Sequence, residues 1–146
     1  MTCSRRCVLQ GLGAAAGALV VLPSCSNSGS SLSTAMTSAC GANTCIDLGD
    51  ATNQPLTTTG GAMLIDLPHD TVMVIRTSDT AVLALSAICT HSGCSMDYDG
   101  GGHRITCPCH GSVFGEDGHV ITGPARRALA IYQANLTGTT ITVVSG

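Results

Sequence analysis

Two short segments in the second half of the chain decide its fold and its chemistry: Cys89-Thr90-His91-Ser92-Gly93-Cys94 and Cys107-Pro108-Cys109-His110-Gly111-Ser112. Each segment supplies one thiolate, one imidazole and one further cysteine. The glycines and the proline provide the permissive or fixed backbone angles that tight loops need. The spacing therefore predicts two loops that each present a cysteine and a histidine together.

Thiolates and neutral imidazoles in this combination suit a [2Fe-2S] cluster, with both cysteines on one iron and both histidines on the other. Imidazoles carry less negative charge than thiolates, so they stabilise the reduced form and raise the reduction potential. The candidate ligands are Cys89, His91, Cys107 and His110. A structural zinc site uses the same residue types, and a disulfide-bonded module without metal is a further alternative. The surplus cysteines favour the cluster, because a four-ligand zinc site has no role for them.

Over residues 60 to 146 the chain resembles the Rieske iron-sulfur proteins, specifically the branch of cytochrome bc complexes and arsenite oxidases whose loops carry an extra cysteine each. The resemblance implies that Cys89 and Cys107 ligate the inner iron and that His91 and His110 ligate the outer iron. It also implies a disulfide between Cys94 and Cys109. The segment Gly123-Pro124-Ala125 is similar to the loop that covers the cluster from a third side in this family.

Three residues in or just after the two loops bear on the reduction potential of the cluster and on the substrate. Ser112 matches the family serine that donates a hydrogen bond to a bridging sulfide, which raises the potential. Phe114 stands where high-potential members carry a tyrosine, so we expect a potential below theirs and above that of oxygenase ferredoxins. Ser92 stands where quinol-oxidising members commonly carry leucine, which counts against quinol as the substrate.

Apolar stretches with strand-like composition predict an all-β fold: an antiparallel β-sandwich of the Rieske type with an inserted cluster-binding subdomain. Abundant glycine, 18 residues, favours turns over helices. The expected strands are 62–66, 71–77, 81–86, 128–135 and 140–144. The expected subdomain covers about residues 87 to 125, within a domain of residues 60 to 146.

The N-terminal 25 residues have the anatomy of an export signal, with Arg5 and Arg6 before an apolar run. The pair resembles a twin-arginine motif, which marks proteins exported already folded. Leu22-Pro23-Ser24-Cys25 resembles a lipobox and predicts lipidation at Cys25. An uncleaved signal anchor and ordinary cleavage downstream are the alternatives. Residues 26 to 59 are then expected to be a flexible tether and N-terminal segment on the periplasmic side of a bacterial membrane.

Nine cysteines are present, and Cys40 and Cys45 remain after the leader, the lipid site and the two loops are assigned. Their spacing suits a small surface disulfide in an oxidising compartment, and a second metal site is the alternative. Beyond residue 25, four arginines stand against nine carboxylates, a net charge of −5. Nucleic acid is an improbable partner for such a chain, and a basic redox protein could be steered toward it.

These features predict electron transfer, in a lipid-tethered periplasmic protein or an oxidoreductase subunit, with a cytochrome or a membrane or molybdenum oxidoreductase as partner. The second prediction is the Rieske subunit of a quinol:cytochrome c reductase. The third is a zinc or disulfide binding module without redox function.

Overall fold

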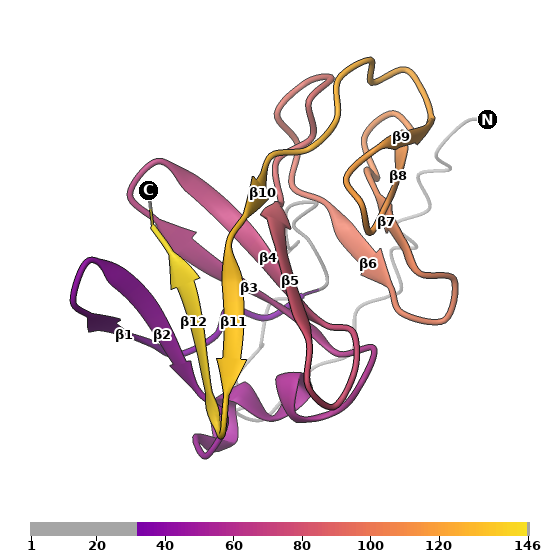
Figure 1. Ribbon diagram of the computed structural model, residues 1–146. Helices are drawn as coiled ribbons and strands as arrows, with labels where there is room; N and C mark the ends of the chain where they lie inside the picture. Colours follow the sequence, from indigo (N-terminus) through magenta and orange to yellow (C-terminus); the bar gives the residue numbers. More distant parts are fainter. Residues whose placement is uncertain (1–31, 146) are drawn as a thin grey trace, which may run out of the picture.

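The computed structural model describes residues 32–145, which form antiparallel sheets and one short 3₁₀ helix. Two four-stranded sheets make a sandwich base, and a third four-stranded sheet forms a separate layer beside it (Figure 1). The predicted all-β class with an inserted cluster-binding subdomain is confirmed.

The central sheet has the order β10-β5-β4-β3, built from β10 (Ile131–Tyr132), β5 (Val82–Ser86), β4 (Asp70–Arg76) and β3 (Ala62–Leu67). Both of its faces are covered, because alternate residues belong to different hydrophobic clusters. Val72 and Val74 pack toward the second base sheet, whereas Met73 and Ile75 pack toward the third sheet. A strand that is buried on both faces reads as a continuous apolar run. The predicted strands 62–66, 71–77 and 81–86 accordingly lie on β3, β4 and β5.

The second base sheet has the order β1-β2-β12-β11, from β1 (Thr37–Cys40), β2 (Asn43–Asp47), β12 (Thr140–Val144) and β11 (Ala134–Thr137). Residues 37 to 47 are therefore part of the packed base, although the sequence suggested that the domain starts at residue 60. The 3₁₀ helix η1 (Ala51–Thr57) follows them. The buried Asn53 side chain connects η1 to β1 and β2, because it accepts from the amide of Met36, just before β1, and donates to the carbonyls of Met36 and Asp47.

The expected strand over 128–135 is split between two sheets in the structure. Ile131 and Tyr132 of β10 pair with β5, whereas β11 pairs with β12 in the other sheet. The chain changes sheets at Gln133, so one apolar stretch serves both layers. The turn between β11 and β12 is tight, since Thr137 pairs directly with Thr140 around Gly138, whose φ is +59°.

The third sheet has the order β6-β7-β8-β9, from β6 (Asp97–Asp99), β7 (Arg104–Thr106), β8 (Val113–Gly115) and β9 (Val120–Thr122). Its buried side chains, which include Ile105 and Phe114, share a hydrophobic cluster with Leu85 of the central sheet. The two cysteine-histidine loops lie at the β5–β6 and β7–β8 connections. This packing fixes the loops to the base.

The expected leader, its twin arginines and Cys25 lie outside the described residues. No helix within residues 32–145 is long and apolar enough to cross a bilayer.

Candidate metal centre

The two loops share one backbone design. The Gly93 amide donates to the Cys89 carbonyl at 2.9 Å, and the Gly111 amide donates to the Cys107 carbonyl at 3.0 Å. Both glycines have a φ of +75°, in the left-handed region that side chains avoid. The Cys89 amide in turn donates across its loop to the Cys94 carbonyl at 2.8 Å.

The second loop repeats that cross-loop bond, because the Cys107 amide donates to the Ser112 carbonyl at 2.8 Å. The loops therefore hold Cys89 and Cys107 in equivalent backbone positions. A cysteine thus begins each loop, and the histidine follows two or three residues later.

The two thiols lie on the inside of the site. Cys89 is 2% exposed and Cys107 is 1% exposed, and both are free of disulfides. Burial, followed by a hydrogen bond with the Cys89 thiol, raises the pKa of the Cys107 thiol. The amides of Cys109 and His110 donate toward the Cys107 sulfur and act in the opposite direction. A nearby metal charge would oppose the effect of burial and favour the thiolate of Cys107.

The two imidazoles lie on the outside of the site. His91 and His110 are exposed, and their ring centroids are 5.0 Å apart with the ring planes at 87°. The Ser92 hydroxyl lies 3.2 Å from Nδ1 of His110. The structure thus places the two predicted cysteine ligands against each other and the two predicted histidine ligands against each other, with sulfur inside and nitrogen outside. This donor set fits a [2Fe-2S] cluster with two sulfur ligands on one iron and two nitrogen ligands on the other.

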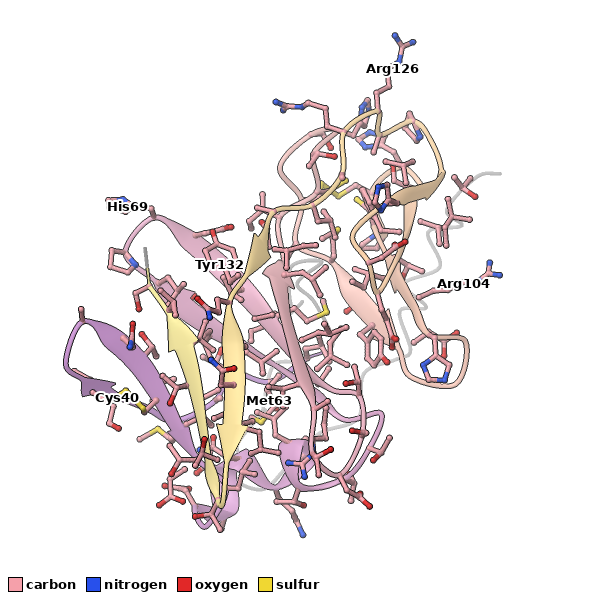
Figure 2. All side chains as sticks on the ribbon, viewed as in Figure 1. Cys40, Met63, His69, Arg104, Arg126 and Tyr132 are labelled. Carbon is pink, nitrogen blue, oxygen red and sulfur yellow. A yellow bond between two sulfur atoms is a disulfide. The ribbon has the colours of Figure 1, made fainter. Side chains whose placement is uncertain are left out.

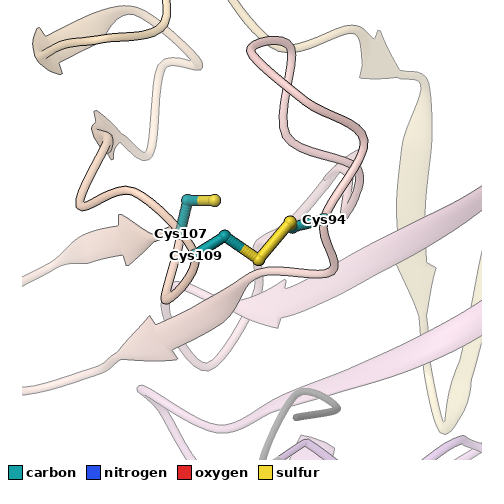
Figure 3. A group of neighbouring side chains, drawn as sticks. All are labelled: Cys94, Cys107 and Cys109. Carbon is teal, nitrogen blue, oxygen red and sulfur yellow. A yellow bond between two sulfur atoms is a disulfide. The ribbon is translucent and has the colours of Figure 1, made fainter. Parts of the chain in front are cut away.

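A disulfide between Cys94 and Cys109 joins the two loops, with a Cα–Cα distance of 6.5 Å. Figure 3 shows this bond beside the Cys107 side chain. The sulfur atoms of these three cysteines lie within 4.8 Å of one another. They are not a thiolate site for a metal ion, because two of them are already bonded together. A second disulfide, Cys40–Cys45, lies in the β1–β2 hairpin, which leaves no thiols there for the alternative metal site.

Ser112 and Phe114, the predicted tuning residues, are both fully buried beside the loops. The Ser112 hydroxyl accepts a hydrogen bond from the Ala125 amide at 3.0 Å. This contact ties the Gly123-Pro124-Ala125 segment to the second loop, and the Gly123–Pro124 bond is cis. Phe114 belongs to the same cluster of buried hydrophobic side chains as Cys89 and Cys107.

Residues 51–133 match the model of the Rieske [2Fe-2S] domain. The chain belongs to this family. Membership implies a [2Fe-2S] cluster as the cofactor, as predicted, in place of the third alternative, a zinc or disulfide module. Which side chains ligate the irons remains the prediction made from the two loops.

The curated relatives of this Rieske chain include iron-sulfur subunits of the cytochrome b6-f complex. The Bigelowiella natans chloroplastic subunit is 51% identical over 47 residues, which are 32% of this chain and 19% of the relative. The subunit of Synechococcus sp. (strain JA-3-3Ab) is 41% identical over 68 residues, which are 47% of this chain and 40% of the relative. The chain spans less than half the length of either protein.

Solved structures with a similar fold include proteins with three different descriptions. The plasma membrane Rieske protein of Synechocystis PCC 6803 is 32% identical with a TM-score of 0.53, over 57% of this chain and 85% of that protein. A chain of a hyperthermophilic respiratory Complex III is 29% identical with a TM-score of 0.53, over 69% and 74%. The ferredoxin of carbazole 1,9a-dioxygenase from Nocardioides aromaticivorans is 27% identical with a TM-score of 0.54, over 61% and 88%.

Sequence reasoning missed one part of the site. A cavity of about 350 Å³ opens beside His91 and is lined also by Thr90, Pro124, Arg126 and Arg127. The two arginines follow the Gly123-Pro124-Ala125 segment directly, so its family resemblance was the available signal. Nothing in the sequence showed that their chain segment returns to the first cluster loop.

Proposed function

We propose that this Rieske protein passes single electrons between a membrane-associated or molybdenum oxidoreductase and a cytochrome, as an exported carrier or as a subunit of such a complex. The observation that carries the proposal is the layered site, with buried Cys89 and Cys107 thiols beneath exposed His91 and His110 rings. Such a layout brings two ligand side chains to the surface where a partner can approach. When bound, the cluster accepts and releases one electron per cycle.

The protein residues around the site have separable roles. Cys89 and Cys107 would hold the inner iron away from water, and the histidines would hold the outer iron. The Cys109 and His110 amides, which donate toward the Cys107 sulfur, stabilise extra negative charge there and so favour the reduced state.

Export and membrane attachment are part of the proposal and rest on the sequence alone. The twin arginines Arg5 and Arg6 support export of a folded, cluster-loaded protein, because a cluster inserted in the cytoplasm needs a route for folded chains. The lipobox-like segment ending at Cys25 supports a lipid anchor on the periplasmic side. Mass spectrometry of the membrane-bound protein would test both, since lipidation leaves Cys25 as the modified N-terminal residue.

A Rieske subunit of a quinol:cytochrome c reductase is the second candidate. It is favoured by the relatives named as cytochrome b6-f subunits and by the likeness to a respiratory Complex III chain. Ser92 counts against it, because this exposed hydroxyl at the His110 ring offers a quinol no apolar surface. A neighbouring cytochrome b gene would favour this candidate, and a neighbouring molybdopterin subunit would favour the first.

Electron paramagnetic resonance after dithionite reduction is the primary test of the cofactor and its ligands. We expect the low average g of a cluster with mixed nitrogen and sulfur ligands. His91→Ala and His110→Ala should each abolish that signal and lower the iron content. The exposed histidines His103 and His119 supply matched controls, and their alanine variants should keep both. Full signal in the His91 or His110 variant would disprove the ligand assignment.

A further inference from the structure

The cavity beside His91 has a cationic lining. Arg126 and Arg127 are both lining residues and both are exposed, and no Asp or Glu belongs to the lining among residues 32–145. Both ion pairs between described side chains use histidines, His103 with Glu116 and His119 with Asp117. Within that part of the chain, neither arginine at the cavity has its charge neutralised by a carboxylate.

The backbone that carries the arginines is fixed to the cluster loops. The hydroxyl of Thr90, the residue before His91, donates to the Arg127 carbonyl at 2.7 Å. Ala125 is bound to Ser112, and the buried Leu129 donates its amide to the Gly118 carbonyl at 2.9 Å. The backbone of the arginine pair is therefore anchored on both sides, by the buried Ala125 and Leu129, and lies against the first cluster loop.

The two arginines make the cavity positively charged, although the net charge of the chain is negative. Beyond residue 25 the net charge is −5, yet two of the four arginines there line this one cavity. Figure 2 shows Arg126 extending from the outer end of the cluster-binding part, while Arg104 lies on a different side. Charges within about one Debye length, about 8 Å at physiological ionic strength, dominate the field that a docking partner meets. The local charge beside His91 is thus positive.

We propose that the Arg126–Arg127 side of the His91 cavity is a docking site for an acidic redox partner protein, whose carboxylates contact the two guanidinium groups. Carboxylates suit these groups because guanidinium can bind them with two parallel hydrogen bonds. This reverses the expectation of a basic partner that the net charge suggested. The redox nature of the partner rests on the proposed function, whereas the acidic docking site stands on the cavity itself.

Binding of an acidic peptide tests the site without any electron transfer. An octaglutamate peptide is titrated calorimetrically into the cluster-containing protein, with octalysine in parallel. We expect octaglutamate to bind, and the Arg126→Gln, Arg127→Gln double variant to weaken it by about tenfold or more. Arg104→Gln is the matched control, since it removes an exposed arginine elsewhere. Equal weakening by Arg104→Gln, or no binding of octaglutamate, would overturn the proposal.

Small oxidants of opposite charge test the same site in the reduced protein. Hexacyanoferrate(III) takes one electron from the reduced protein and becomes hexacyanoferrate(II), and cobalt(III) tris-phenanthroline is the cationic counterpart. Stopped-flow rates with hexacyanoferrate should fall by about threefold or more as the Debye length shrinks from about 30 Å to about 8 Å. The double variant should lose this dependence and Arg104→Gln should keep it. A hexacyanoferrate rate that rises with salt would show that the net charge governs and would overturn the proposal.

The two readouts separate this proposal from the proposed function. A protein that binds octaglutamate through Arg126 and Arg127 but exchanges no electrons keeps the docking site and loses the electron-transfer function. A protein that exchanges electrons but binds no acidic peptide loses the docking site alone.

Discussion

The hydroxyl oxygen of Ser112 accepts a hydrogen bond from the Ala125 amide at 3.0 Å, across 13 positions of sequence and inside the protein core. A serine hydroxyl can accept and donate at once. Because the Ala125 amide uses a lone pair, the hydroxyl proton stays available for a sulfur of the bound cluster. One side chain therefore both fixes the Gly123-Pro124-Ala125 segment and can act as a donor at the metal centre.

Removal of that donor should lower the reduction potential. A hydrogen bond to a charged group contributes about 1.5–3 kcal/mol, which for one electron corresponds to about 60–130 mV. We expect Ser112→Ala to lower the potential by an amount of this order in protein-film voltammetry. Ser86→Ala is the control, because the buried Ser86 hydroxyl also accepts a backbone amide, that of Ile88, at 3.2 Å. An equal shift in both variants would contradict a direct role for Ser112.

Phe114→Tyr should raise the potential. The Phe114 ring is fully buried in the cluster of side chains that contains Cys89 and Cys107. A tyrosine hydroxyl that donates to a ligand sulfur should add about 60 mV or more. Phe114→Leu is the control, because it changes packing without adding a donor. An unchanged potential in Phe114→Tyr, together with a loss of about 1–3 kcal/mol of unfolding free energy, would indicate a buried hydroxyl without a partner.

Loss of the disulfide between the cluster loops should destabilise the metal centre more than loss of the hairpin disulfide does. Cys94–Cys109 closes a 15-residue separation and joins the two loops, whereas Cys40–Cys45 closes five residues within one hairpin. Loss of a disulfide of the longer span costs about 3 kcal/mol. The Cys94→Ser, Cys109→Ser variant should therefore lose its metal cluster at a lower urea concentration than the unchanged protein does. The visible absorbance of the cluster measures this loss. Equal bleaching of the Cys40→Ser, Cys45→Ser variant would remove the special role of the loop disulfide.

Both tyrosines of the chain should resist ionisation in the folded protein. Burial, and then the hydrogen bond from its hydroxyl to Glu116 at 2.5 Å, raise the pKa of Tyr98. The hydrogen bond from its hydroxyl to Asp70 at 2.7 Å, and then burial, raise the pKa of Tyr132. In the unfolded chain a tyrosine ionises near its ordinary pKa of about 10. The stabilisation is therefore complete below about pH 10 and is lost as the pH rises above it.

Ultraviolet absorbance at high pH measures this directly, because the chain has two tyrosines and no tryptophan. We expect little tyrosinate at pH 10 in the native protein and normal ionisation in urea. Tyr132→Phe isolates the Tyr98 signal. Native tyrosines that ionise at pH 10 would contradict the two carboxylate contacts.

The sequence predicted the fold best where one local signal was strong. Val72 to Ile75 form a continuous apolar stretch because the strand is buried on both faces, and this pattern is visible without any structure. The short strands of the third sheet have three residues each and give almost no periodic signal. Their order follows from pairing between distant segments, which a single sequence does not reveal.

The cysteine and histidine spacing by itself determined the family, the cluster chemistry and the candidate ligands, because metal coordination depends on residue type and local loop geometry. Only the tertiary structure decided three other matters. It placed residues 37 to 47 in the base sheet through long-range strand pairing. It decided between the predicted Cys40–Cys45 disulfide and the alternative metal site, in favour of the disulfide. It also brought Arg127 against Thr90, 37 positions away, and so made a positive surface beside His91 on an acidic chain. Net charge is a sum over the sequence, whereas the field at a docking surface depends on where the fold places each charge.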